Sequence, residues 1–407
     1  MFTVLLVIIY VAFISLGIPD SILGSAWPSM YEFLSVPVGY AGIITMIIAA
    51  CTIVSSLASD FLNKNLGTAR VMIISVSLTA LALFGFSQST KFIHLCLLGI
   101  PYGLGGGSVD AALNNYVALH YKARHMSWLH CFWGIGTMVG PIVMSSFIAN
   151  GGVWTQGYRA ISIFQICLVV VLVLSWPLWK KCSAKSVEEK GASGKSDEKQ
   201  VGEPCENDVA KNESKSIFSV LKVKGVVAAV LTFLCYCAIE STAGLWASTY
   251  MVFAREIDIN IATRWAMMFF VGITAGRFLS GFVSEKLGDK TLVRLGYVII
   301  FLGIILLLLP IHSKALVCAA LICTGFGCAP IYPSLIHSTP NSFGKENSQA
   351  LIGLQMACAY TGSTFVPPIF GILVQTISVR ILPLFLLVFL VLLICFNERR
   401  NKVVSSM

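Results

Sequence analysis

The chain has 407 residues, of which 57% are hydrophobic and only 12% are charged, and its mean hydropathy is +0.83. Soluble domains carry about 25% charged residues, so this composition excludes a set of ordinary soluble domains and indicates an integral membrane protein. The formal net charge of +9 comes from Lys and Arg residues concentrated in alternate loops, and it does not indicate a nucleic-acid partner.

Twelve segments are long and apolar enough to cross a lipid bilayer, because a spanning helix needs about 20 mostly apolar residues. In chain order they lie near residues 2–27, 38–60, 69–88, 91–117, 127–149, 158–179, 221–251, 262–284, 291–310, 314–337, 347–375 and 381–397. The sequence therefore predicts an all-α protein with twelve transmembrane helices.

A polar segment separates the first six spans from the last six. Residues 181–216 are rich in Lys, Glu, Ser and Gly and contain few large apolar side chains, so we expect a largely disordered cytoplasmic linker. Residues 1–180 and 217–407 should then form the N-terminal and C-terminal six-helix bundles. Basic residues gather in the linker and in the loops on its side, which places both termini in the cytoplasm.

Three acidic residues lie deep within predicted spans: Asp20, Asp110 and Glu240. A carboxylate at the bilayer centre costs about 3 kcal/mol or more, so each of them should face a cavity or a partner. A carboxyl group that water reaches from alternate sides can take up a proton on one side and release it on the other. Asp20 and Glu240 are therefore the candidate proton-coupling residues. The alternative is a carboxyl that neighbouring Ser or Asn side chains hold without a functional role.

Several polar and aromatic residues of the spans are candidates for binding a solute. Asp110 and Asn114 are four positions apart and share one helix face, where a carboxylate and an amide could bind sugar hydroxyls. A polar clamp between helices is the alternative for this pair, and packing or interface anchoring is the alternative for the aromatic residues. The remaining candidates are His130, Trp246, Tyr332 and Gln355.

Charged residues near the cytoplasmic ends of the spans predict a gate that closes that side of the protein. Arg277 lies near the cytoplasmic end of its span, eight positions before Glu285 and on a similar helix face, so the two side chains could form a gate pair. The side chain of Arg277 could instead reach the membrane interface. The loop charges could also serve only to orient the chain in the membrane. The candidate gate residues are Asp60, Arg70, Arg277, Glu285, Lys286 and Lys290.

The two halves repeat several features in the same order. Asp20-Ser21 returns as Glu240-Ser241, and Gly136-x-x-x-Gly140-Pro141 returns as Gly362-x-x-x-Val366-Pro367. Repeated halves with a binding site near the bilayer midplane are typical of secondary transporters. The repeat predicts two pseudo-symmetric six-helix bundles.

These residues carry a resemblance that covers essentially the whole chain. The segment 281–290 is similar to the cytoplasmic loop motif of the major facilitator superfamily. Within it, Asp20, Asp110-x-x-x-Asn114 and Leu129-His130-x-Phe132 resemble the fucose permease group of sugar:proton symporters. The resemblance implies the major facilitator fold, alternating access and sugar uptake driven by protons. It also implies that Asp20 takes the proton and Asp110 contacts the sugar.

This sequence departs from the pattern of that group at three positions. The acid of the fourth span is Asp110 where the group leads us to expect Glu, and His130 replaces an expected amide. Glu240 adds an acid to the seventh span that the resemblance does not imply. These departures bear on the identity of the solute more than on the fold.

The sequence predicts a secondary active transporter that imports a sugar or sugar-like polar solute by alternating access, driven by proton or sodium symport. The alternative is a proton-coupled efflux antiporter for drugs or metabolites, which the Gly136-x-x-x-Gly140-Pro141 sequence also suits. We expect a monomer in the plasma or inner membrane, without a cofactor, a metal or catalytic residues. A sensor or a membrane enzyme fits less well, because the linker has no folded output domain and the spans carry no catalytic motif.

Overall fold

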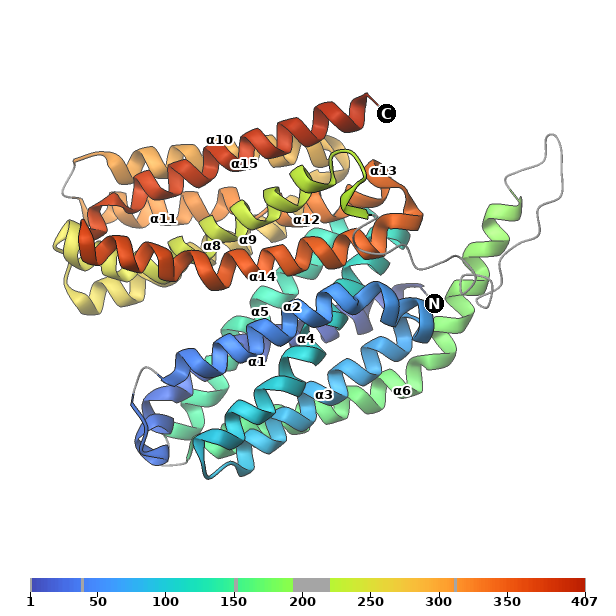
Figure 1. Ribbon diagram of the computed structural model, residues 1–407, viewed down its shortest axis with the longest axis horizontal. Coiled ribbons are helices and arrows are strands. Elements are labelled where there is room, and N and C mark those ends of the chain that lie inside the picture. The colour runs from blue at the N-terminus through green and yellow to red at the C-terminus, as the bar shows by residue number, and fades with distance from the viewer. Residues whose placement is uncertain (1, 38–39, 150–152, 193–219, 311–312, 407) are drawn as a thin grey trace.

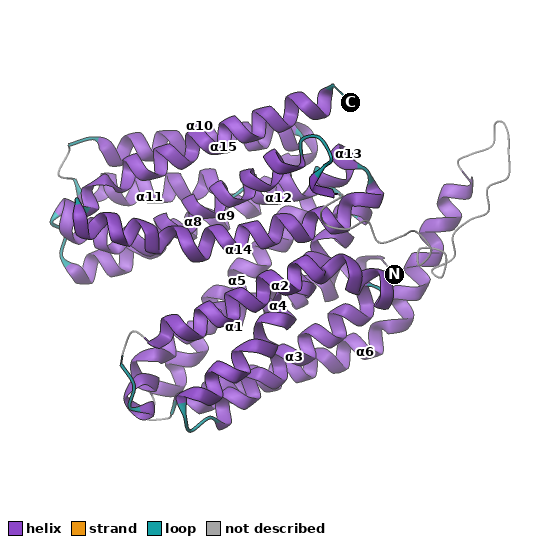
Figure 2. Cartoon of the chain, in the orientation of Figure 1, coloured by secondary structure: helices purple, strands orange, loops and turns teal. Residues whose placement is uncertain are grey.

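The computed structural model describes residues 2–37, 40–149, 153–192, 220–310 and 313–406, and within these ranges it contains helices and loops but no strand (Figure 2). Twelve of its helical segments are long and apolar enough to cross a membrane. The predicted number of spans and the all-α class are thereby confirmed.

Two groups of helices lie side by side and diverge from one end to the other (Figure 1). Both termini lie at the end where the groups meet, which we call the terminal end; we call the other end the open end. The first bundle contains α1 (Phe2–Leu34), α2 (Ala41–Leu66), α3 (Thr68–Gln88), α4 (Phe92–His120), α5 (Ala123–Ala149) and α6 (Trp154–Ala192). Within it α1 packs on α5, and α4 packs between α2 and α3.

The second bundle has the same arrangement. It contains α8 (Val226–Arg255), α9 (Ile259–Leu287), α10 (Asp289–Leu308), α11 (Lys314–Cys328), α12 (Ile331–His337), α13 (Thr339–Phe343), α14 (Lys345–Thr376), η3 (Val379–Ile381) and α15 (Leu382–Ser405). Here α8 packs on α14, and α11 packs between α9 and α10. The helix α6 continues beyond the predicted domain boundary at residue 180. The remainder of the predicted linker, residues 193–216, lies outside the described residues.

Matched glycines bring matched pairs of helices together. A Cβ atom on Gly136 of α5 would lie 2.3 Å from the carbonyl oxygen of Ile14 on α1, and one on Gly362 of α14 would lie 2.5 Å from that of Leu234 on α8. Small residues allow this close backbone approach between membrane helices. The repeat seen in the sequence therefore corresponds to equivalent helix contacts in the two bundles.

Two prolines interrupt backbone hydrogen bonding in α1 and α5, and side chains take over the freed carbonyl groups. Pro19 cannot donate to the carbonyl of Ser15, which instead accepts from Nε2 of Gln165 at 3.0 Å. Pro141 likewise leaves the carbonyl of Thr137 free, and Oγ of Ser21 donates to it at 2.8 Å. A membrane interior supplies no water for these groups, so the side-chain partners are needed.

The tenth span is broken between α11 and α12, at Ala329 and Pro330. Proline lacks the backbone N–H that would continue the helix. The break starts the short helix α12, whose second residue is Tyr332. It thus helps to direct this tyrosine toward the first bundle.

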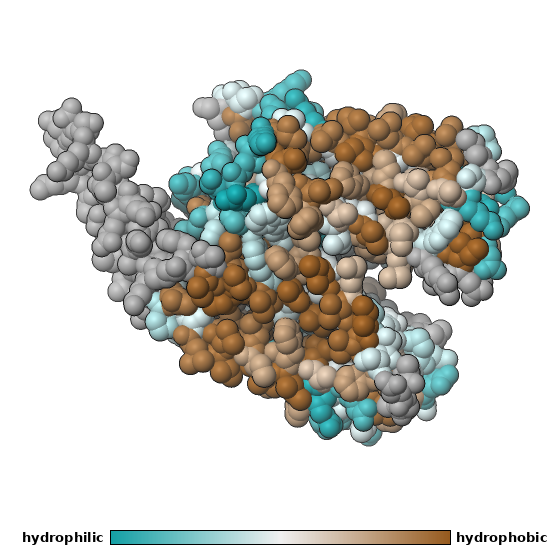
Figure 3. All heavy atoms as spheres, turned by 180° about the vertical axis from the view of Figure 1, so that it is seen from behind, coloured by the Kyte–Doolittle hydropathy of each residue, from teal (hydrophilic) through white to brown (hydrophobic). Residues whose placement is uncertain are grey.

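Apolar side chains cover much of the face of both bundles that Figure 3 shows. Leu174 is 74% exposed, Phe253 is 70% exposed and Ile142 is 65% exposed. Such a surface suits lipid rather than water, because apolar patches of this extent are rare on soluble monomers. The fold is therefore that of a multi-pass membrane protein.

Candidate functional site

A cleft separates the two bundles and opens at the open end, away from the termini (Figure 3). At its base the first bundle contributes residues of α1, α4 and α5, and the second contributes residues of α8, α9, α12 and α14. The side chain of Asp20 is exposed, although its position lies deep in α1. An acid in this part of a span is tolerated when it faces such a cavity.

Three predicted residues of the first bundle form one hydrogen-bonded group. Nδ2 of Asn114 donates to Oδ1 of Asp110 at 2.8 Å, and Nε2 of His130 donates to Oδ1 of Asn114 at 3.1 Å. Asn114 is fully buried and His130 is 5% exposed, so the hydrogen bonds fix both side chains. The spacing of four residues on α4 and the facing position on α5 bring the group together.

Tyr360 connects this group to the second bundle. Its hydroxyl group, carried by α14, donates to Oδ2 of Asp110 at 2.8 Å. The ring of Tyr332 on α12 stands edge-on to the ring of His130, with centroids 4.8 Å apart. Polar and aromatic groups from both bundles therefore meet at Asp110 and His130.

Arg277 is the second link between the bundles. Its Nη2 lies 3.1 Å from Oε1 of Glu240 on α8, and its Nη1 donates to the carbonyl oxygen of His130 at 3.4 Å. The side chain of Arg277 is only 3% exposed, and that of Glu240 is 17% exposed. A guanidinium keeps its charge in a protein, so Glu240 serves here as the counter-ion of a buried cation.

Trp133 joins this ion pair to Asp20. The guanidinium carbon of Arg277 lies 5.5 Å from the centroid of the Trp133 ring. The indole Nε1 of the same tryptophan donates to Oδ2 of Asp20 at 3.0 Å. All three deep acids are thus connected through Trp133, Arg277 and the backbone of His130. We define the central network as Asp20, Asp110, Asn114, His130, Trp133, Glu240, Arg277, Tyr332 and Tyr360.

Two predicted binding residues do not join the central network. Nε1 of Trp246 donates to the carbonyl oxygen of Pro367 at 3.1 Å, so this tryptophan packs α8 against α14. Gln355 is 1% exposed and exchanges hydrogen bonds with the hydroxyl group of Thr339 at 3.2 Å. In this conformation both side chains form hydrogen bonds between helices of the second bundle.

The bundles close against each other at the terminal end through two helix pairs, α5 with α9 and α2 with α14. Glu285 at the end of α9 lies 3.0 Å from Nε of Arg124 and 3.5 Å from Nζ of Lys122. On the other side, Nδ2 of Asn63 donates to Oε1 of Gln349 at 3.1 Å. The closure therefore combines ion pairs at Glu285 with uncharged hydrogen bonds, which include those of Gln349 with Ser59 and of Trp128 with the carbonyl oxygen of Phe278.

Glu285 is the only predicted gate residue for which the described part of the chain records an ion pair between the bundles. Asp60 pairs with Lys64 on its own helix at 2.8 Å, and Arg70 lies over the ring of Trp176 on α6, 5.1 Å from its centroid. Lys286 and Lys290 are exposed. Arg277 belongs to the central network, and its partner is Glu240 rather than Glu285. Glu285 lies eight positions further along the chain, near the end of α9 at the terminal end.

Sequence reasoning did not select Tyr360, Lys122 or Arg124 as functional residues. Tyr360 is one of many aromatic residues in the spans, and only its place opposite Asp110 distinguishes it. Lys122 and Arg124 counted only among the loop charges that orient the chain in the membrane. In the structure both of them face Glu285 of the other bundle. In each case the informative partner lies in the other bundle.

Comparison with known proteins places the whole chain in one family. The family model described as the Major Facilitator Superfamily matches residues 9–263 and 254–403. Bypass of stop codon protein 6 of Saccharomyces cerevisiae is 22% identical over 394 residues, which cover 92% of this chain and 78% of the yeast protein. The glucose/mannose transporter GlcP of Bacillus subtilis is 20% identical over 280 residues, which cover 68% of this chain and 65% of that protein.

Solved structures agree with this assignment. FucP, described as a fucose:proton symporter of E. coli, has an outward-conformation crystal structure that matches with a TM-score of 0.75. The match covers 97% of this chain and 98% of that chain at 13% sequence identity, so the similarity concerns the fold alone. Together with the family match it identifies a multi-pass membrane transporter and not an enzyme: the chain belongs to the Major Facilitator Superfamily.

Proposed function

We propose that this transporter imports a sugar or a similar polyol by symport with a proton or a sodium ion. The observation that carries the proposal is the hydrogen-bonded chain from His130 through Asn114 and Asp110 to Tyr360, which crosses from one bundle to the other. Carboxylate, amide and phenol groups at the base of a cleft suit a solute with several hydroxyl groups. A solute inserted there would contact both bundles at once.

The similar proteins support a sugar as the solute. FucP is described as a fucose:proton symporter, and GlcP is described as a glucose/mannose transporter. The rings of Tyr332 and Trp133 lie beside this hydrogen-bonded group and are partly exposed, and the C–H faces of a sugar ring can stack on such rings. Efflux of apolar drugs would suit a more apolar cleft than one lined by Asp20, Asp110 and Tyr360.

We assign the coupling ion to Asp20. This carboxyl group is exposed to the cleft and accepts one hydrogen bond, from Trp133, so it remains accessible to an ion. Glu240, the other candidate, can bind an ion only by giving up its pairing with Arg277. It is therefore the second choice. Because Arg277 already has a carboxylate partner, it does not offer a free cation to an anionic solute.

The positions of the basic residues support an orientation with both termini in the cytoplasm, so that the cleft opens to the outside. In this orientation the protein would take a solute from outside and release it inside after the terminal end opens. We place it in the plasma or inner membrane and propose that one chain suffices for transport, because each chain contains both bundles.

The first experiment identifies the solute and the ion. The purified protein is reconstituted in proteoliposomes, and counterflow exchange is measured with sugars, polyols, organic anions and typical efflux substrates. Uptake is then driven by a proton gradient or by a sodium gradient. Exchange of a sugar or polyol, with accumulation under one of the two gradients, is expected. Exchange restricted to apolar drugs or organic anions would contradict the proposed solute class.

The second experiment tests Asp20. Asp20→Asn imitates the protonated carboxyl group in shape but cannot release an ion, so counterflow should persist while accumulation against a gradient is lost. Glu32→Gln is a matched control, since this exposed acid lies near the end of the same helix. If Asp20→Asn still concentrates the solute several-fold, the ion is carried elsewhere, and Glu240 must be tested next.

A further inference from the structure

A second cavity lies in the C-terminal bundle, at the terminal end and away from the central network. It has a volume of about 320 Å³ and is lined by residues of α10, α12, α13 and α15. Among the residues that line it are Asp289, Lys290, Ser338, Ser342 and Arg400. Its volume falls within the range of about 300–1,000 Å³ that is typical of small-molecule sites.

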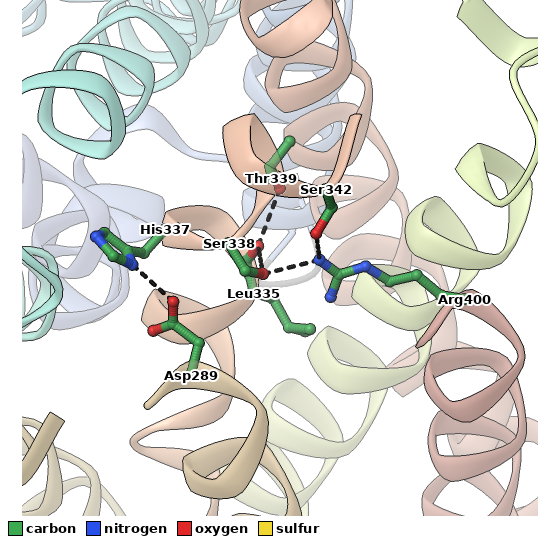
Figure 4. Close-up of polar contacts among 7 residues, drawn as sticks. All are labelled: Asp289, Leu335, His337, Ser338, Thr339, Ser342 and Arg400. Carbon is green, nitrogen blue, oxygen red and sulfur yellow. Dashed lines mark hydrogen bonds and ion pairs between the residues drawn. The ribbon is translucent and has the colours of Figure 1, made fainter. Parts of the chain in front are cut away.

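Arg400 brings a buried positive charge to this cavity. The side chain is 4% exposed, and its Nη2 donates to Oγ of Ser338 at 2.8 Å and to Oγ of Ser342 at 2.9 Å (Figure 4). The ring of Phe343 covers the guanidinium, with its centroid 5.8 Å away. Within the described residues, no carboxylate lies at ion-pair distance from Arg400, and its Nε has no hydrogen-bond partner. A buried charge in this situation is costly without a counter-ion.

Two further groups at the cavity lack hydrogen-bond partners, and one of them is a donor while the other is an acceptor. Nδ2 of Asn401 is a buried donor without an acceptor. Oδ1 of Asp289 is a buried acceptor without a donor, while the Oδ2 of the same carboxylate lies 2.7 Å from Nδ1 of His337 (Figure 4). Buried polar groups are normally paired, so each unpaired group calls for a partner.

These groups together define the chemistry of a ligand. The buried guanidinium of Arg400 favours an anion, and the exposed ammonium of Lys290 at the edge of the cavity adds a second positive charge. The amide of Asn401 can donate to the anion after a small rotation. Asp289 repels an anion but accepts from a hydroxyl group. Arginine and lysine are the usual partners of phosphate. A phosphate monoester that also carries hydroxyl groups satisfies both requirements.

We propose that this cavity binds a phosphorylated polyol, supplied either as a soluble sugar phosphate or as the phosphorylated headgroup of an inositol lipid. The ligand would hold α10, α13 and α15 together around Arg400. Because α12 carries Tyr332 near one end and His337 at the other, occupancy of the cavity would also restrain a residue of the central network. The site is thus placed to regulate transport from the terminal end.

Binding is measured on the purified full-length protein, by calorimetry and by the shift of the thermal unfolding midpoint. The soluble probes are glucose 6-phosphate and inorganic phosphate. The lipid probe is a phosphatidylcholine nanodisc with or without phosphatidylinositol 4-phosphate. Stabilisation by glucose 6-phosphate indicates a soluble ligand, and stabilisation by the inositol lipid alone indicates a lipid ligand. If neither probe stabilises the wild-type protein, the proposal is wrong.

Variants then locate the binding. Arg400→Gln should weaken binding at least tenfold, and Lys290→Gln, which changes an exposed side chain and leaves the fold intact, should weaken it about threefold or more. Arg399→Gln is the matched control, because it removes the same charge from an exposed position outside the cavity. Asn114→Ala should also leave phosphate binding unchanged, which separates this site from the transport site. Equal binding by wild type and Lys290→Gln, or loss of binding in Arg399→Gln, would overturn the assignment.

Discussion

The ion pair between Arg277 and Glu240 should respond asymmetrically to the removal of its two partners. Glu240→Gln leaves Arg277 charged, 3% exposed and without a carboxylate at ion-pair distance in the described residues. Breaking a buried pair in this way costs about 3–5 kcal/mol. The remaining contacts of the guanidinium, to the backbone of His130 and the face of Trp133, carry no full negative charge and cannot replace it.

Arg277→Gln should be milder. The Glu240 side chain is 17% exposed and can become neutral by taking up a proton, whereas a guanidinium cannot lose its charge. The loss should then be that of a hydrogen bond with a charged group, about 1.5–3 kcal/mol. In the double variant two amides face each other, so the double variant should be more stable than Glu240→Gln alone.

The assay is the thermal unfolding midpoint of the three variants in one detergent, supported by the fraction that remains monodisperse after heating. A change of 1 kcal/mol shifts the midpoint by about 2–4 °C for 150–250 residues, the size of one bundle, so Glu240→Gln should fall by on the order of 10 °C. Glu285→Gln, which removes an exposed acid at the end of α9, is the control and should change the midpoint little. The reasoning fails if both single variants lose the same stability, or if the double variant is no better than Glu240→Gln.

Three further predictions concern the binding group and the closure. Asn114→Ala leaves the buried partners Asp110 and His130 unpaired, at about 1–3 kcal/mol, so calorimetry should record binding of the transported solute weakened tenfold or more; an unchanged dissociation constant would remove Asn114 from the site. Gly281→Ala places a Cβ atom 2.1 Å from Nε1 of Trp128 and should loosen the contact of α5 with α9, whereas Gly24→Ala, the control, meets nothing within 4 Å. The accessibility of cysteines at the terminal end should rise in Gly281→Ala and stay unchanged in Gly24→Ala. Glu285→Gln removes an exposed ion pair worth about 0.2–1 kcal/mol, so the same accessibility should rise slightly at low salt and converge with wild type at high salt; an equal difference at both salt concentrations would argue against an electrostatic latch.

The sequence by itself determined the fold class and the chemistry of the deep acids. Twelve spans follow from the length and composition of apolar segments, and these properties do not depend on the partners of a helix. The unusual cost of Asp20, Asp110 and Glu240 in an apolar span is likewise visible residue by residue. The repeated glycines also indicated two matching bundles, although only the structure shows that they bring α1 to α5 and α8 to α14.

Only the tertiary structure decided which side chains meet. Periodicity along α9 allowed a pair between Arg277 and Glu285, but helix packing brings Arg277 to Glu240, 37 positions away in the chain. Tyr360 reaches Asp110 across 250 positions because α14 and α4 face each other between the bundles. A helical pattern shows which residues share a face, and it does not show which face of another helix lies opposite. For that physical reason the acids could be selected from the sequence, while the network that joins them could not.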